Sequence, residues 1–196
     1  MSAQTKKMST KTLALGAILT ALVIILQLMG SFIRFGMFQV SLVLIPIVVG
    51  AALCGKYIGA WLGFVFGVVV LLNGDATAFL TVDVLGTILT VLLKGTLCGF
   101  FSGLVYDLIA KKNIYVAVVA AAIVCPLVNT GIFLLGCLVF FMDTISVWAA
   151  GAGFGEDTVK YMFLGLAGGN FLFELGFNIV LSPVIVRLLS ITKKVK

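Results

Sequence analysis

One lysine stands inside an otherwise apolar run of the sequence, LTVLLKGTL, at position 94. If this run is helical, the polar residues Thr90, Thr87 and Asp83 lie on the same helix face as the lysine, four, seven and eleven residues before it. An intramembrane charge is costly, so it normally faces a cavity or a partner. We therefore predict that this face lines a polar ligand cavity. A structural ion pair and a proton relay remain alternatives.

A second polar stripe occurs in GGNFLFELGFNIV, where Asn170, Glu174 and Asn178 are spaced by four residues. A further amide, Asn129, lies in the apolar stretch CPLVNTGIF. Within the helices proposed below, Lys94, Glu174 and Asn129 each lie about twelve or thirteen residues from a helix end, roughly 20 Å and hence near the middle of a bilayer. We predict that the two stripes and Asn129 line one substrate-binding cavity, with pairing of Lys94 and Glu174 to each other as the alternative.

The composition indicates whether these residues lie in a soluble protein or in a membrane protein. The chain has 196 residues, of which 62% are hydrophobic and 10% charged, with a mean hydropathy of +1.29. Soluble domains carry about 25% charged residues. We therefore predict an all-α integral membrane protein with a single membrane domain, residues 1–196, formed by a bundle of six transmembrane helices. The predicted spans lie approximately at 12–33, 40–54, 57–73, 82–110, 114–142 and 161–189.

The second and third of these segments are short for spans, and the second contains Pro46. We still predict two helices there, because residues 40–73 are too long for one span and CGKYIG supplies a break. Glycines recur every fourth residue from Gly55 to Gly67 and from Gly95 to Gly103. This spacing predicts close packing of the third and fourth spans.

The basic residues flank the predicted spans, so the net charge of +6 indicates topology rather than nucleic-acid binding. With both termini in the cytoplasm, ten basic residues lie inside and only Arg34 and Lys160 lie outside. The ten are Lys6, Lys7, Lys11, Lys56, Lys111, Lys112, Arg187, Lys193, Lys194 and Lys196. The first segment is expected to remain as a span, because its apolar stretch is too long for a cleaved signal.

The sequence lacks the residue patterns typical of metal binding, of histidine-based catalysis and of ATP binding by a P-loop. The chain contains no histidine, its four cysteines form no CxxC pair, and no stretch matches the P-loop pattern. We expect no bound metal, no cofactor and no enzymatic activity, so any ATP hydrolysis belongs to partner subunits. A membrane-embedded enzyme or assembly factor remains an alternative, although few residues are suited to catalysis.

The first span carries Ala17 and Ala21 four residues apart in LALGAILTAL, a small-residue face where another helix could lie close. Six short-looped spans, a basic N-terminus and this AxxxA face resemble the substrate-binding S component of an energy-coupling factor (ECF) vitamin transporter. The stretches FQVSLVLIPIVVGAALCGKYIGAWLGFVFG, LLKGTLCGFFSGLVYDLI and ELGFNIVLSPVI are similar in character to spans two to three, four and six of that family.

The resemblance implies a function. S components bind a vitamin or its precursor and associate with an ECF module of one transmembrane T protein and two ATPases, in a bacterial-type plasma membrane. By analogy, Ala17 and Ala21 would contact the T protein. The loops that help to close the pocket in this family correspond to Arg34–Gln39 and to residues 143–160, which include Trp148.

The residue types only partly restrict which vitamin could bind. Lys94 and Arg34 could meet a carboxylate or phosphate, whereas the asparagines can both donate and accept hydrogen bonds. A small anionic vitamin such as pantothenate suits the lysine, and neutral riboflavin is the main rival. A stand-alone secondary transporter, with Lys94 and Glu174 as a proton or ion relay, remains an alternative of another class.

Overall fold

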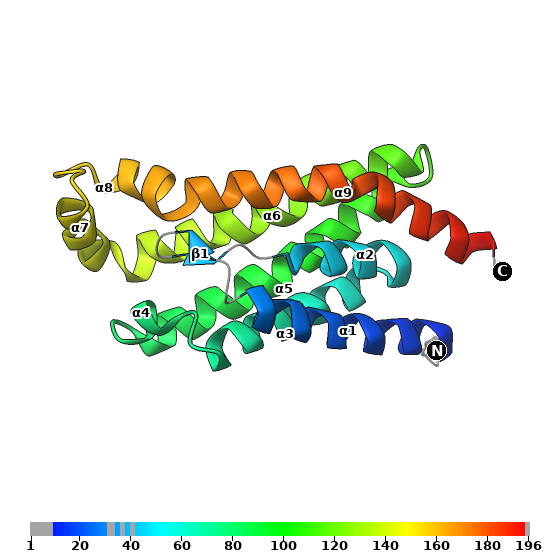
Figure 1. Ribbon diagram of the computed structural model, residues 1–196, viewed down its shortest axis with the longest axis horizontal. Helices are drawn as coiled ribbons and strands as arrows, with labels where there is room; N and C mark the ends of the chain where they lie inside the picture. The colour runs from blue at the N-terminus through cyan, green and yellow to red at the C-terminus, as the bar shows by residue number, and fades with distance from the viewer. Residues whose placement is uncertain (1–9, 31–33, 36–37, 40–41, 195–196) are drawn as a thin grey trace, which may run out of the picture.

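The computed structural model describes residues 10–30, 34–35, 38–39 and 42–194. Its long helices run along the longest axis, with the two chain ends together and α4, α7 and α8 at the opposite end (Figure 1). The elements are α1 (Thr10–Gly30), β1 (Arg34–Phe35), β2 (Phe38–Gln39), α2 (Leu44–Cys54), α3 (Lys56–Leu72), α4 (Thr77–Leu80), α5 (Val84–Ile109), α6 (Ile114–Phe140), α7 (Met142–Gly151), α8 (Thr158–Lys160), a π-helix η1 (Tyr161–Gly168) and α9 (Gly169–Lys194).

The prediction of an all-α membrane protein is confirmed, apart from one small hairpin. Among the described residues, four helical segments are long and apolar enough to cross a bilayer, namely α1, α5, α6 and residues 158–191, while α2 and α3 are apolar but shorter. The two-residue strands β1 and β2 pair antiparallel, with Arg34 opposite Gln39. Sequence periodicity did not predict this hairpin, because strands of two residues are too short to show an alternating pattern.

The predicted break between the second and third segments is confirmed at Gly55. This residue joins α2 to α3 with a φ of +94°, a conformation that glycine adopts at little cost. Pro46 is the third residue of α2 and therefore lies in its first turn. Backbone N–H groups there have no partner within the helix, so the proline does not interrupt α2.

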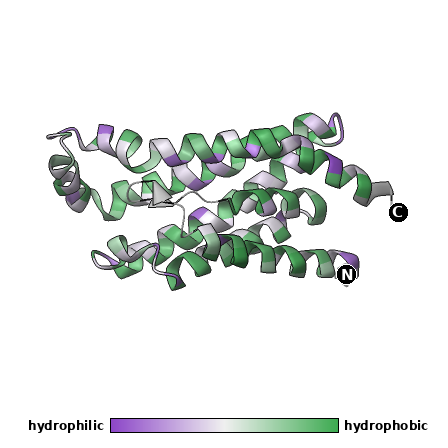
Figure 2. Ribbon diagram, viewed as in Figure 1, coloured by the Kyte–Doolittle hydropathy of each residue, from purple (hydrophilic) through white to green (hydrophobic). Residues whose placement is uncertain are grey.

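The distribution of polarity is that of a protein surrounded by lipid. Large apolar side chains such as Leu13, Val139 and Val180 are more than 60% exposed, whereas Glu174 and Asn178 are at most 2% exposed. Apolar residues cover much of the helices between the two ends of the bundle (Figure 2). A bilayer solvates such an exterior, and buried polar groups in that setting usually have a function.

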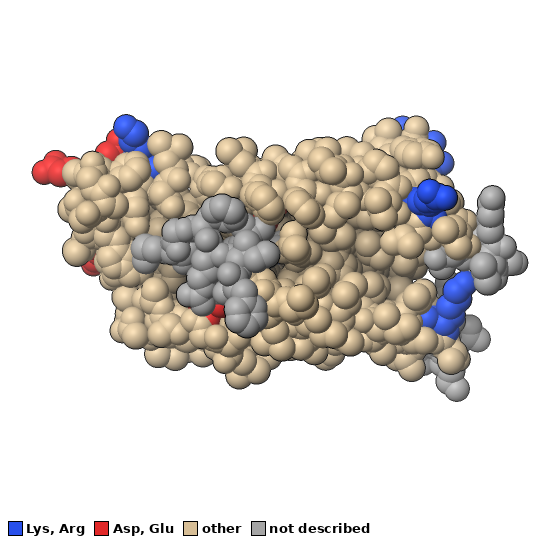
Figure 3. All heavy atoms as spheres, in the orientation of Figure 1, with Lys and Arg blue, Asp and Glu red and all other residues tan. Residues whose placement is uncertain are grey.

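Charged side chains gather at the two ends of the bundle (Figure 3). Lysine and arginine predominate at the end that holds both termini, and most of the visible acidic side chains lie at the other end. Because the middle of the exterior carries almost no charge in this view, the charged ends mark the boundaries of the apolar band.

The glycine ladders bring α3 and α5 into close contact, as the sequence predicts. A Cβ atom added at Gly59 would lie 2.5 Å from the carbonyl oxygen of Gly99, and one added at Gly63 would overlap the carbonyl oxygen of Gly95. Backbone atoms cannot move aside as side chains can. The two helices therefore need glycine at these crossing points.

We predict that Gly63→Ala lowers the free energy of unfolding by roughly 1–3 kcal/mol, because the methyl group would force the two backbones apart. Thermal unfolding of the purified protein in detergent measures the change. Gly131→Ala in α6 is the matched control, since a methyl group there meets no atom within 4 Å. Equal unfolding temperatures for both variants and the wild type would contradict tight packing of α3 on α5.

Candidate functional site

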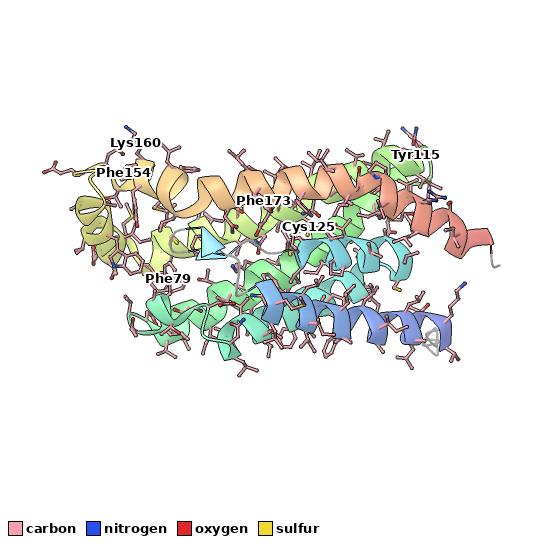
Figure 4. The ribbon with its side chains drawn as sticks, viewed as in Figure 1. Phe79, Tyr115, Cys125, Phe154, Lys160 and Phe173 are labelled. Carbon is pink, nitrogen blue, oxygen red and sulfur yellow. The ribbon has the colours of Figure 1, made fainter. Side chains whose placement is uncertain are left out.

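A cavity of about 270 Å³ lies inside the bundle. Helices α1, α3, α5, α6, η1 and α9 contribute to its wall, together with the connection between α3 and α5. Phe79, a lining residue in α4, lies toward the end away from the termini, as do Phe154 and Lys160 (Figure 4). The cavity is therefore displaced from the middle of the bundle toward the end with the acidic side chains.

The polar face predicted for residues 83–94 is present on α5, and Thr87, Thr90 and Lys94 line the cavity. Asp83 is not among the lining residues. It precedes α5 as its N-cap, where its carboxylate accepts a hydrogen bond from the Gly86 N–H at 3.0 Å. Its role in the described structure is to begin the helix that carries the other three residues.

The Lys94 ammonium lies between two aromatic rings. Its Nζ is 5.8 Å from the ring centroid of Phe66 and 5.4 Å from that of Phe133. Within the described residues it forms no hydrogen bond and no ion pair. A charge at a helix centre costs about 2.5–3.5 kcal/mol, and a desolvated cation–π contact contributes about 2 kcal/mol. The rings thus offset part of the cost, and the carboxylates of Glu174 and Asp75 also attract the ammonium, which keeps its hydrogen-bonding capacity for a ligand.

Residues from α6 and α9 form a further part of the wall. Asn129, Asn170 and Glu174 line the cavity, so the structure brings both predicted stripes to one space. The Asn170 side-chain amide donates to the Glu174 carboxylate at 3.2 Å. Asn178 is not a lining residue; its amide donates to the backbone carbonyl of Glu174 at 2.8 Å, one turn further along the buried face.

A contact that sequence reasoning missed joins α1 to the α3–α5 connection. The side-chain amide of Gln27 donates to the carboxylate of Asp75 at 2.8 Å, and both residues line the cavity. Gln27 is only 3% exposed. The amide stands alone in the apolar stretch LVIILQLMG, and its polarity there was a signal that could have identified it.

We predict that Gln27→Leu destabilises the protein by roughly 1–3 kcal/mol, because it removes a hydrogen bond from a carboxylate inside the bundle. Thermal unfolding again reports the effect. Thr20→Val removes the hydrogen bond that the exposed Trp61 indole of α3 donates to Thr20, together with the local bond from Thr20 to the Gly16 carbonyl. It should change stability by less, because no carboxylate loses a partner. A larger loss for Thr20→Val than for Gln27→Leu would show that the Gln27–Asp75 contact is unimportant.

Two segments, residues 34–39 and 143–160, are predicted to cover the pocket, and the structure describes the second more fully than the first. Residues 143–160 include most of helix α7, and none of them lines the cavity. Trp148 instead packs its ring edge-to-face on Phe79, with centroids 5.5 Å apart. Trp148 thus supports a lining residue from behind. For Arg34 and Gln39 the structure describes only the backbone pairing, so their predicted side-chain contacts with substrate remain predictions.

Aromatic side chains form a second part of the wall that sequence patterns did not identify. Phe66, Phe79, Phe133 and Phe141 all line the cavity, and the ring of Phe79 meets those of Phe133 and Phe141 at 5.7 and 5.0 Å. The chain has sixteen phenylalanines, most of which need no ligand in a membrane protein, so their residue type alone gave no signal.

The face predicted to meet a partner is on the outside of α1. Ala17 and Ala21 are exposed, while Gly16, Leu19 and Val23 turn the opposite side of the helix into the bundle. Helix α1 therefore presents small side chains outward and, through Gln27, reaches the cavity wall inward.

Comparison with known proteins identifies the family. The model of the family described as "ECF transporter, substrate-specific component" matches residues 11–186. Neither the curated proteins nor the solved structures give a significant match to the chain. The family match covers most of the chain, from the beginning of α1 into α9. The protein therefore belongs to the substrate-specific components of ECF transporters, which bind transport substrates and are not themselves enzymes.

Proposed function

We propose that this chain captures a small water-soluble vitamin or vitamin precursor and delivers it to an ATP-driven ECF importer. The observation that carries the proposal is a cavity within an apolar-surfaced bundle, lined by an ammonium, amides, hydroxyls and aromatic rings. Ligand sites combine an apolar wall with a few well-placed polar groups, as this cavity does. The family match supports the same role.

We assign substrate contact to Lys94, Thr87, Thr90, Asn129, Asn170 and Glu174, because they line the cavity. Asn178 holds the backbone at Glu174, Asp83 begins α5 and Trp148 supports Phe79, so these three act on the pocket indirectly. Arg34 and Gln39 remain proposed contacts from the hairpin. Pantothenate is the first candidate ligand and riboflavin the second.

We infer that the chain forms one membrane domain with six spans, in which α2 and α3 are the short ones. The basic end that holds both termini faces the cytoplasm by the positive-inside rule, which puts the cavity nearer the outer surface (Figure 3). A bacterial-type plasma membrane is the expected location. The outward face of α1 at Ala17 and Ala21 then meets the T protein, and two ATPases complete the importer.

Reconstitution into liposomes tests this function. Uptake of radiolabelled pantothenate or riboflavin should require the chain, the T protein, both ATPases and ATP, and should survive a protonophore. The matched control contains the chain alone. Accumulation by the chain alone, abolished by the protonophore, would overturn the proposal and identify a secondary transporter instead.

A further inference from the structure

The charged groups of the cavity differ in whether they already have partners. The Asp75 carboxylate accepts a hydrogen bond from Gln27, and the Glu174 carboxylate accepts one from Asn170. The Lys94 ammonium is attracted electrostatically by both carboxylates, most strongly by Glu174, but it forms no hydrogen bond and no ion pair among the described residues and lies over two aromatic rings. Among the described residues, Lys94 is therefore the charged group of the cavity that still lacks a hydrogen-bond partner, which a ligand could supply.

The charged residues that line the cavity also restrict the net charge of the ligand. Lys94 is the single basic side chain among the described lining residues, and two carboxylates share the cavity with it. A monocarboxylate matches the one ammonium, whereas the second negative charge of a dianion such as a phosphate monoester would have no cation to balance it and would add to the repulsion from Asp75 and Glu174. A cationic ligand would be repelled by Lys94. The two carboxylates that could attract it already accept hydrogen bonds from Gln27 and Asn170.

Three further lining residues bear buried oxygens that have no hydrogen-bond partner in the described part of the chain. They are Thr90 Oγ1, Asn129 Oδ1 and Asn170 Oδ1. Thr90 and Asn129 are each 5% exposed. The amide orientation of Asn170 is set by its bond to Glu174, so its oxygen is an acceptor. Unpaired buried acceptors are unfavourable, and a ligand that supplies O–H or N–H groups would satisfy them.

We propose that the ligand is a small monocarboxylate that also carries hydroxyl or amide N–H donors. Its carboxylate binds the Lys94 ammonium, and its donors meet the oxygens of Asn129 and Asn170. Phe66 and Phe133 flank the charged end and exclude water from it. This inference rests on the proposed function, but it goes further, because it rejects neutral, cationic and dianionic vitamins as preferred ligands.

The test compares acids with neutral analogues of nearly the same shape. The probes are pantothenate against pantothenol, biotin against biotinamide, and nicotinate against nicotinamide, each titrated into the purified chain in nanodiscs. At least one acid should bind with a Kd at least about 100-fold lower than that of its neutral partner, the loss expected when a buried charge pair is broken. In Lys94→Gln that preference should disappear.

Three results would overturn the inference: no acid binds more tightly than its partner, the preference persists in Lys94→Gln, or neutral riboflavin binds equally well to both proteins. The wild-type comparison stands even if Lys94→Gln does not fold. Co-purification of the chain with the T protein tests the proposed function separately. If the chain still associates with the T protein but shows no preference for acids, only the proposed ligand class is wrong. If it does not associate with the T protein, the proposed importer role is wrong.

Discussion

Replacing Lys94 by leucine should lower the affinity for the transported vitamin by roughly 10²–10³-fold while leaving the protein folded. Leucine fits the surroundings of Phe66 and Phe133 and removes a charge that costs free energy in a bilayer. We therefore expect an unchanged or higher unfolding temperature together with the loss of binding. Equilibrium dialysis with radiolabelled pantothenate, and with riboflavin in parallel, measures the affinity.

Lys56→Leu provides the control for this prediction. Lys56 also lies against aromatic rings, those of Tyr57 and Phe100, but it is at the beginning of α3 and outside the cavity. Its replacement should leave the affinity unchanged. If Lys94→Leu bound the vitamin as tightly as the wild type does, Lys94 would have no role in the pocket.

Replacing Ala17 and Ala21 together by tryptophan should stop uptake while sparing ligand binding. The two alanines are exposed on the outside of α1, and bulky side chains there would keep a partner helix from close approach. The cavity wall is formed by the other face of this helix, so the pocket should be unaffected. Uptake into liposomes with the complete importer should fall to the level without T protein.

A matched control carries tryptophan elsewhere on the apolar exterior. Leu135 in α6 is 60% exposed, and Leu135→Trp adds comparable bulk away from α1. This variant should transport normally and co-purify with the T protein. Loss of binding by the alanine variant with intact T-protein association would show that α1 serves the pocket rather than the partner.

Helical periodicity predicted the parts of the cavity that lie on long helices. The repeat of 3.6 residues is a local property, so the spacing of Thr87, Thr90 and Lys94 was enough to put them on one face. The same reasoning identified Asn170 and Glu174. It also included Asp83, because spacing alone does not distinguish the first residue of a polar stripe from the N-cap that precedes the helix.

The remaining features depend on how distant segments meet. Asp75 and Phe79 belong to a short connection whose path over the cavity is set by contacts with Gln27 and Trp148, residues far away in the sequence. Likewise, residues 143–160 are rich in glycine, yet part of them forms helix α7 behind Phe79. Local sequence patterns carry no information about such contacts.

Native mass spectrometry of the purified chain tests the central claim, that the cavity around Lys94 holds a small nutrient. We expect a bound species of vitamin size on the wild-type protein and on the Ala17→Trp/Ala21→Trp variant, and its loss from Lys94→Leu. A wild-type protein that carries only lipid after exposure to the candidate vitamins, or an equally occupied Lys94→Leu, would contradict this claim.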